Sequence, residues 1–211
     1  LGDVLRSELE KAQMSELYYE IELPLCEVLA SMEVTGVMVD CEGIKSFGES
    51  LDVDIESLKS EIYELAGHEF NISSPKQLGT VLFEELGLPA GKKTKSGYST
   101  GAEILEGLAN VHPIINPILE YRTLTKLKST YVDGLLAVVC PDGRVRSEFK
   151  QTETRTGRIS SANPNMQNIP VRKEIGSNMR KFFVAAKGRE LVDADYSQIE
   201  LRVLASMCGD K

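Results

Sequence analysis

The sequence predicts an α+β fold, with helices in the earlier part of the chain and strands in the later part. Apolar side chains recur every three or four residues between 44 and 65, which is typical of an amphipathic helix. Further on, Val145, Ser147, Phe149 and Gln151 alternate with charged or polar neighbours, which is typical of a strand. The period changes again at residue 197, where a strand-like run passes into a helical one. We therefore expect a mostly helical unit followed by the start of a sheet.

Two long helices are expected first. Residues 14–34 carry apolar side chains at steps of three and four, and Pro24 either delays the start of this helix or kinks it. Gly36 is placed as its C-cap. The next helix has Asp40 as its N-cap and ends at Gly67, and the acidic residues on its outer face are interpreted as a solvated surface. Its inner face has the cleanest period of the chain: Ile44, Phe47, Leu51, Ile55, Leu58, Ile62 and Leu65.

A third helix begins after Ser74, which combines with Pro75 and Gln77 into an N-cap, a first-turn proline and a capping box. Gly87 closes this helix and opens the stretch GLPAGKKTKSGYST. Composition favours an exposed loop here. The alternative is a mobile tip, whose lysines and hydroxyls would meet phosphates without regard to base sequence. Three lysines lie in it: Lys92, Lys93 and Lys95.

Two more helices precede the first strand. Thr100 and Glu103 match a capping box that would start a short helix. Pro113 would start a longer one, which runs to about Val139. Three cations are expected on its polar side: Arg122, Lys126 and Lys128.

A polar segment follows the turn at 141–143 and the strand at 145–151. Residues 151–172, QTETRTGRISSANPNMQNIPVR, are rich in hydroxyls and amides and nearly free of aliphatic side chains, so they cannot form core. Arg, Thr, Asn and Gln suit sugar, phosphate and minor-groove acceptors, which are present at every base pair. A polar surface loop is the alternative, but it does not explain why arginines and amides dominate between 156 and 170.

The end of the chain combines an expected strand at 191–196 with a helix that begins after Ser197. Ser197 and Glu200 match a capping box. The helix is expected to be mostly buried, because its apolar residues are frequent: Ile199, Leu201, Val203, Leu204 and Met207. Asp195 would then lie between the strand and the first N–H groups of the helix, which favour anions. With a phosphate nearby, such a carboxylate suits Mg²⁺; otherwise it is a cap or a solvated turn residue.

Composition and charge limit the possible classes. An apolar content of 42% is enough for a core, and no apolar run is long enough to span a membrane. Four cysteines without paired spacing predict neither a disulfide framework nor a zinc site, so we expect a reducing compartment. The net charge of −8 is uneven: residues 1–75 hold 17 acidic against 4 basic residues, and residues 76–211 hold 15 against 20. Any polyanion is therefore expected to bind the later part.

Several of these stretches resemble one known family. DYSQIELR, residues 195–202, is similar to the first palm motif of family A DNA polymerases, and residues 151–172 are similar to the primer–template segment of that family. SPKQLGTVLFEELGLP (74–89) and LEYRTLTKLKSTY (119–131) resemble its thumb subdomain. Residues 18–40 resemble the helix that leaves its exonuclease domain. The resemblance thus covers nearly the whole chain, and its two carboxy-terminal motifs are the most specific.

The resemblance implies an incomplete polymerase right-hand fold. Residues 1–36 would be a connecting helix from an exonuclease-like domain, 37–143 the mostly helical thumb, and 144–211 the start of an antiparallel-sheet palm. The fingers helix, the second catalytic carboxylate and the exonuclease acids of the family would lie outside the chain. The 211 residues alone are therefore expected to be catalytically inactive.

It also implies roles for individual residues. Asp195 and the carbonyl of Tyr196 would bind two Mg²⁺ ions, and Glu200 would crowd a ribose 2′-hydroxyl, with Ser197 and Gln198 beside the dNTP. One further residue, Arg158, would contact the primer terminus from the minor groove. The other expected DNA contacts are Thr152, Thr154, Thr156, Asn165, Gln167, Asn168, Lys126, Lys128 and the tip at 92–100.

The implied function is template-directed DNA synthesis in replication and repair, by attack of a primer 3′-hydroxyl on a dNTP. The expected partners are primer–template DNA and dNTPs, with a monomeric protein, no membrane and a cytoplasmic bacterial location; an organelle or phage origin stays open. Two alternatives belong to other classes. One is a non-catalytic duplex-binding module, and the other is a Mg²⁺-dependent phosphohydrolase built on Asp193 and Asp195. An RNA polymerase of related fold is a lesser possibility, because Glu200 suits deoxynucleotide selection.

Overall fold

The protein is mostly helical, as the sequence predicts, and the computed structural model describes residues 1–90, 93–94, 97–169 and 178–209. The helices are α1 (Gly2–Lys11), α2 (Leu23–Thr35), α3 (Cys41–Ala66), α4 (Pro75–Thr80), α5 (Ala102–Gly107), α6 (Ile115–Leu127), α7 (Gly134–Leu136) and α9 (Ile199–Cys208). Three π-helical segments adjoin them: η1 (Leu17–Glu22), η2 (Val81–Glu85) and η3 (Lys128–Asp133). The strands are short: β1 (Val37–Val39), β2 (Lys93–Thr94), β3 (Gly97–Tyr98), β4 (Arg144–Val145), β5 (Glu148–Lys150), β6 (Ser160–Ala162) and β7 (Phe183–Val184).

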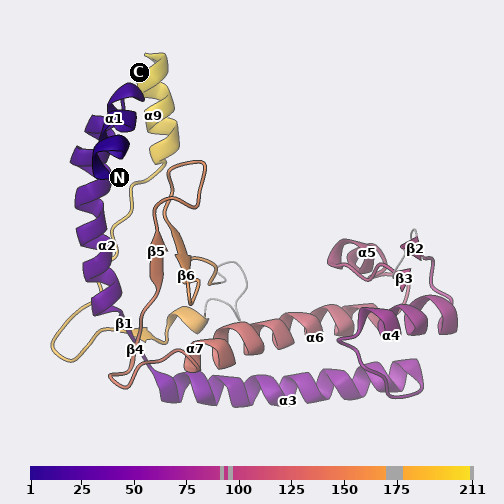
Figure 1. Cartoon of the computed structure of the whole chain (residues 1–211). Helices are drawn as coiled ribbons and strands as arrows, with labels where there is room; N and C mark the ends of the chain where they lie inside the picture. Colours follow the sequence, from indigo (N-terminus) through magenta and orange to yellow (C-terminus); the bar gives the residue numbers. More distant parts are fainter. Residues whose placement is uncertain (91–92, 95–96, 170–177, 210–211) are drawn as a thin grey trace.

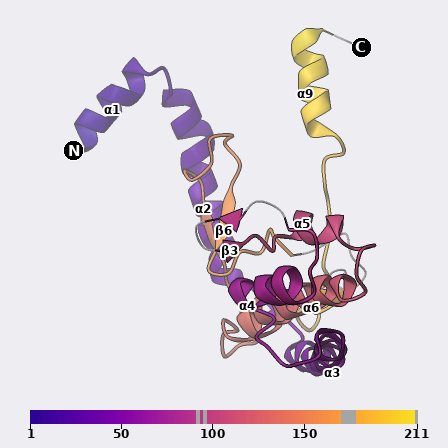
Figure 2. The ribbon, with the colours of Figure 1, turned by 90° about the vertical axis from the view of Figure 1, so that its right-hand side faces the viewer.

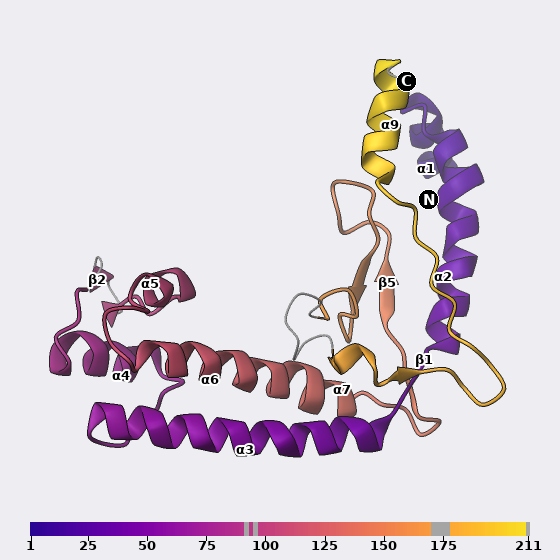
Figure 3. The same cartoon turned by 180° about the vertical axis from the view of Figure 1, so that it is seen from behind.

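These elements form two arms that meet at one end of α3 (Figure 1). In the helical arm, α3 and α6 lie side by side, with α4 and α5 at the far end; the view from behind shows the same arrangement (Figure 3). In the upright arm, α2, β5, β6 and α9 rise away from α3. Although α1 and α9 overlap in the first view, they lie well apart when the molecule is turned (Figure 2).

Helix α3 forms as its sequence predicts. The carboxylate of Asp40 accepts a hydrogen bond from the Gly43 N–H at 3.0 Å, and Gly67 ends the helix in the left-handed conformation, with φ of +82°. Between these caps, Ile44, Leu51, Ile55 and Ile62 are buried.

The predicted helix at 14–34 is also present, but it consists of η1 followed by α2, with Pro24 in the first turn of α2. Gly36 follows as the C-cap, with φ of +61°. Helix α1 precedes this helix and was not predicted. Apart from Leu29, the side chains of α2 are not buried.

Two clusters of buried side chains hold the helical arm together. The far cluster fills the space between α3, α4, α5 and α6 with eleven buried residues: Ile62, Ile72, Leu78, Leu82, Phe83, Leu88, Leu105, Leu108, Ile114, Ile115 and Ile118. The near cluster lies where the two arms meet: Val39, Ile44, Leu51, Ile55, Leu124, Leu127, Val132, Leu135, Val145 and Met179. Each such side chain contributes about 1.5–3 kcal/mol through burial.

The capping boxes expected at 74 and 100 are only partly formed. Ser74 caps α4 as predicted, since its hydroxyl accepts from the Gln77 N–H at 3.4 Å; the Gln77 amide, however, accepts from the Asn71 N–H at 2.8 Å. The box at Thr100 is wrong. Its hydroxyl accepts from the Arg122 guanidinium at 3.1 Å, and its carbonyl accepts from the same guanidinium, so the N-cap of α5 is the next residue.

The long helix expected from Pro113 to Val139 is present as the continuous run of α6, η3 and α7. Arg122 lies on the same side of this run as Lys126, as expected, because both border one open groove. The guanidinium turns inward onto Thr100, and its burial lowers the pKa of Arg122. Carbonyl and hydroxyl oxygens replace water there, which is how a charged group is tolerated away from solvent.

A small antiparallel sheet joins the two arms, in the order β4-β1-β7. Val37 pairs with Val145, and Met38 with Val184. The turn at 141–143 is confirmed, and the two hydrogen bonds from the Arg146 guanidinium, at 2.6 and 2.9 Å, lower the pKa of Asp142 to about 2. Strand β1 was not predicted. In the tip at 92–100, β2 pairs with β3, while Lys92 and Lys95 lie outside the described residues.

The strand predicted at 191–196 is wrong. In the described part of the chain its backbone pairs with no other strand, and its apolar side chains are exposed: Leu191, Val192 and Tyr196. An alternating pattern becomes a strand only where a neighbouring strand accepts and donates the backbone hydrogen bonds. The strand nearest to this stretch in the sequence is β7, which ends at Val184, before residue 191.

Helix α9 is present, but its predicted cap and its predicted burial are both wrong. It begins at Ile199, after Gln198 in the left-handed conformation with φ of +56°, and no side chain caps it. The N-cap position is therefore Gln198 and not Ser197, and Glu200, the other half of the expected box, is bound to Arg158. The apolar side chains of α9 are exposed: Ile199, Leu201, Val203, Leu204 and Met207.

Within the described ranges, no helix combines the length and the apolar content needed to cross a membrane.

Ile62→Ala should destabilise the chain, since Ile62 is fully buried in α3 and its truncation leaves a cavity. We expect the free energy of unfolding to fall by about 2–5 kcal/mol, measured by urea titration. Val53→Ala, in the same helix but 71% exposed, is the control and should change it by less than about 0.5 kcal/mol. Equal losses in both variants would contradict the assignment of the core.

Glu85→Gln should lower the melting temperature mainly at low pH. The Glu85 carboxylate lies 2.7 Å from Nε2 of His68 and raises the pKa of His68 above 6.5, with help from the Glu69 carbonyl. A raised folded-state pKa stabilises the fold below the unfolded value and loses that effect as pH rises through the folded value. The difference from wild type should therefore be larger at pH of about 5.5 than at about 8.5. Glu61→Gln, at an exposed glutamate without an ion pair among the described residues, should show no such dependence.

Candidate nucleic-acid interface

The polar segment expected at 151–172 forms a hairpin and the loop that follows it. Strand β5 pairs with β6 in antiparallel register, with Phe149 opposite Ser161, and the connection between them is largely exposed (Figure 1). The exception is Ser161, which is buried; its hydroxyl lies 2.6 Å from that of Ser147 and accepts from the Met166 N–H at 3.0 Å. The expectation that the segment forms no core thus holds for most residues up to 169, but Met166 and Ile169 pack against the near cluster; residues 170–172 lie outside the described ranges.

Several polar side chains of this segment hold its own shape. The Thr154 hydroxyl donates to the carbonyl of Arg158 at 2.6 Å, which closes the hairpin turn. The Gln167 amide donates to the carbonyl of Ile159 at 2.8 Å, and the Asn165 side chain accepts from the Gln167 N–H at 3.0 Å. Three expected DNA contacts therefore also have an internal role. The remaining ones in the segment are exposed: Thr152, Thr156, Arg158 and Asn168.

Gln151, at the start of the segment, ties it to the upright helix. Its amide nitrogen donates to the carbonyl of Glu22 at 3.0 Å and to its carboxylate at 2.8 Å, and its amide oxygen accepts from the Cys26 thiol at 2.9 Å. Further along, the Glu33 carboxylate accepts from the Phe149 N–H at 2.6 Å. These bonds attach the hairpin along the upright helix at its first strand.

The hairpin and α9 meet through one ion pair. The Arg158 guanidinium lies 2.8 Å from the Glu200 carboxylate, and both side chains are more than 70% exposed. Such a pair is screened by water and salt, so it adds little to stability. Its importance is positional, because it places two predicted site residues, 42 positions apart in sequence, in direct contact.

Asp195, Tyr196, Ser197 and Gln198 lie just before α9 and are all exposed. The Asp195 carboxylate makes no side-chain hydrogen bond or ion pair with another described residue, so its oxygens are available to a ligand. An exposed carboxylate followed by a backbone carbonyl fits Mg²⁺, which takes few protein ligands and completes its shell with water and phosphate. No cluster of three His, Cys, Asp or Glu that could hold a metal ion occurs among the described residues.

The helical arm contributes a lysine near the polar loop. Lys126 lines a pocket of about 390 Å³ together with Tyr131, Asn165 and Asn168, and it also borders an open groove of about 700 Å³ beside Thr100. Lys128 faces the other way, where its ammonium lies 3.4 Å from the carboxylates of Asp52 and Asp133. The structure thus brings Lys126 to the loop and leaves Lys128 on the α3 side.

Two residues at this interface were not singled out in the sequence. Tyr131 donates from its hydroxyl to the carbonyl of Asn168 at 2.5 Å, and Gln151 holds the hairpin to α2. Gln151 could have been found as the position where the alternating strand pattern runs into the polar segment. Tyr131 gave no such signal, because one aromatic in a helix is ordinarily a packing residue.

Comparison with known proteins identifies relatives over the whole chain. Residues 41–211 match DNA polymerase family A. DNA polymerase I of Lactococcus lactis (strain IL1403) is 51% identical over 207 residues, which are 98% of this chain and 24% of that protein. DNA polymerase I of Geobacillus stearothermophilus is 52% identical over 212 residues, 100% of this chain and 24% of that protein. The chain thus spans about a quarter of the length of these relatives.

A solved structure shows the same fold. The polymerase domain of Pol1 from M. smegmatis, in complex with a DNA primer–template and a dNTP, superimposes with a TM-score of 0.86 at 41% identity. The match covers 96% of this chain and 36% of that one, so the two arms correspond to part of a polymerase right hand.

Proposed function

Because the chain belongs to DNA polymerase family A, we propose that its protein performs template-directed DNA synthesis, adding dNTPs to a primer 3′-hydroxyl in replication and repair. The observation that carries this proposal is the contact between Arg158 and Glu200 at 2.8 Å. It joins the polar segment, which suits a duplex, to the helix whose start holds Asp195. The end of a duplex bound by the polar segment would thereby lie close to a phosphate or a metal ion bound beside Asp195.

The two arms correspond to subdomains in this proposal. Residues 37–143 are the thumb, 144–211 the start of the palm, and 1–36 the connecting helix. The assignment of the thumb is supported by the two core clusters of the helical arm and by α3 and α6, which form its long axis. The sheet of β1, β4 and β7 would then be the joint where all three parts meet.

Primer–template DNA is the proposed partner of the polar segment and of Lys126. Arg158 donates to the primer terminus in the minor groove, and the hydroxyls and amides accept and donate along the backbone: Thr152, Thr154, Thr156, Asn165, Gln167 and Asn168. Lys126, exposed beside two of these amides, holds a duplex phosphate. Lys128 has a smaller part in this, because two carboxylates already neutralise it.

Nucleotide and metal belong at the start of α9. Asp195 and the Tyr196 carbonyl would hold Mg²⁺, and bound there the ions would lower the pKa of the primer hydroxyl and neutralise the charge of the triphosphate. Ser197 and Gln198 lie along the dNTP, while the Glu200 side chain crowds the 2′ position and so favours deoxyribose. The exposure of these side chains supports the assignment, since a substrate site must be open to its ligand.

The alternative is a non-catalytic duplex-binding module. It is favoured by the fact that most of the proposed DNA contacts are exposed, whereas the candidate metal ligands among the described residues are few. The 211-residue chain by itself is expected to bind a duplex without extending it.

We further propose that the protein acts as a monomer in the cytoplasm, where its bacterial relatives' DNA lies.

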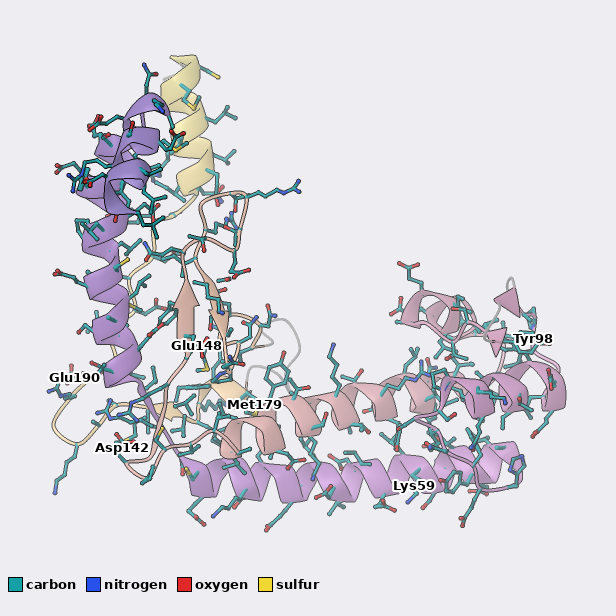
Figure 4. All side chains as sticks on the ribbon, in the orientation of Figure 1. Lys59, Tyr98, Asp142, Glu148, Met179 and Glu190 are labelled. Carbon is teal, nitrogen blue, oxygen red and sulfur yellow. The ribbon has the colours of Figure 1, made fainter. Side chains whose placement is uncertain are left out.

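Lys126→Ala should weaken binding of the 211-residue chain to primer–template DNA equally for all base sequences. Loss of one phosphate contact should reduce the slope of log affinity against log salt by about one, measured by fluorescence anisotropy. Lys59→Ala is the matched control, because Lys59 is a half-buried lysine of α3 that pairs with Glu56, away from the proposed interface (Figure 4). Identical slopes in wild type and both variants would count against the proposed phosphate contact.

The proposed function is tested by primer extension with a longer protein that contains this chain, Mg²⁺ and defined templates. We expect incorporation dictated by the template, and binding without any extension would favour the duplex-binding module. In the same assay, Glu200→Ala should lower discrimination against ribonucleotides by about tenfold or more, because excluding one hydroxyl sterically is worth up to about a hundredfold. Glu190→Ala, at an exposed glutamate far from α9, should leave discrimination unchanged (Figure 4).

A further inference from the structure

We propose that Tyr131 is a positioning residue, which holds the loop at 163–168 against the helical arm so that its amides face the duplex together with Lys126. We call these six residues the amide loop. The inference rests on the proposed function, because it concerns the way in which the DNA contacts Asn165, Gln167 and Asn168 are kept in place. It assigns to Tyr131 no contact with DNA of its own.

The geometry of Tyr131 carries the first step. Its hydroxyl donates to the carbonyl of Asn168 at 2.5 Å, across 37 positions of sequence. The ring is half-buried and packs against the near cluster, as do Met166 within the amide loop and Ile169 directly after it. Packing therefore fixes the ring, and the fixed ring fixes where the hydroxyl points.

The other bonds of the amide loop make this one distinctive. Asn165 bonds to Gln167, Gln167 bonds to Ile159, and the Met166 N–H bonds to Ser161, so these contacts define the loop's internal shape and its tie to β6. In the described ranges, the bond from Tyr131 is the one hydrogen bond between the amide loop and the helical arm. Together with the packing of Met166 and Ile169 against the near cluster, this bond sets the position of the loop's polar groups relative to α6.

Position relative to α6 matters because Lys126 lies there. Lys126, Tyr131, Asn165 and Asn168 all line the pocket of about 390 Å³, and Tyr131 is bonded to the carbonyl of Asn168 at its edge. A duplex that contacts the lysine with a phosphate and the amides with its minor groove needs both at a fixed separation. A loop released from Tyr131 would still fold but would have to be ordered by the DNA, which costs affinity.

Tyr131→Phe tests this inference, since it keeps the ring and removes only the hydroxyl. The matched control is Tyr63→Phe in the far cluster, where the hydroxyl likewise donates to a backbone carbonyl, that of Phe70, at 2.9 Å. Both variants should lose similar thermal stability. Only Tyr131→Phe should raise the dissociation constant of the 211-residue chain for primer–template DNA, by about three- to tenfold, as expected for one lost hydrogen bond. The salt slope should stay unchanged, because no phosphate contact is removed.

A double-mutant cycle separates positioning from general stability. If Tyr131 acts through the amide loop, Tyr131→Phe should have little further effect on affinity in an Asn165→Ala background, whereas additive losses would overturn the inference. Equal loss of affinity in Tyr63→Phe would overturn it as well.

Amide hydrogen exchange without DNA distinguishes failure of this inference from failure of the proposed function. Tyr131→Phe should speed exchange at residues 163–168, and Tyr63→Phe should not. If the wild-type chain binds no DNA, the proposed function is overturned, and with it the DNA role of the loop, even where Tyr131→Phe speeds exchange. Unchanged exchange and affinity in a chain that binds DNA would overturn the positioning role alone.

Discussion

The packing of α3 against α6 is the constraint on which the rest of the molecule depends. Ile44, Leu51 and Ile62 on the first helix and Ile118 and Leu124 on the second are almost completely removed from water. Helix α6 continues without a break into η3 and α7, so the same packing determines where the far end of the arm, the lysine at 126 and the tyrosine at 131 lie. The upright arm has much less buried surface of its own. It is attached through short strands and individual hydrogen bonds, which specify direction more than they supply stability.

Elements that depend on nearby residues could be predicted from the sequence. The caps at Asp40 and Ser74, the helix end at Gly67 and the turn at 141–143 involve groups a few positions apart, so the sequence contains all that is needed to form them. The features that failed depend on distant partners. Thr100 is a residue type that often caps helices, but its hydroxyl accepts a hydrogen bond from Arg122, 22 positions later. Glu200 likewise accepts a hydrogen bond from Arg158. Local patterns cannot reveal such competition.

The candidate site shows the same division. Residue types in the polar segment indicated a grip on nucleic acid, and the relatives belong to a family of DNA polymerases. What the sequence could not indicate is how each amide divides its hydrogen bonds between the loop itself and a ligand. Thr154, Asn165 and Gln167 make internal bonds in the structure, while Arg158 reaches the start of α9. Periodicity predicted that α9 is buried and that a strand precedes it. Burial depends on residues that pack over a helix, and a strand depends on a pairing partner, and neither is contained in the pattern itself.

The π-helical segment between α6 and α7 has a consequence for how one rod serves two surfaces. A π turn takes up one residue more than an α turn, so the faces before and after it are rotated by about 100° relative to one another. Lys128, at its start, points toward Asp52 of α3, and Tyr131, three positions on, points toward Asn168. The extra residue therefore changes the direction in which successive side chains of this run point. Lys128 can face α3 while Tyr131 faces the loop at 163–168.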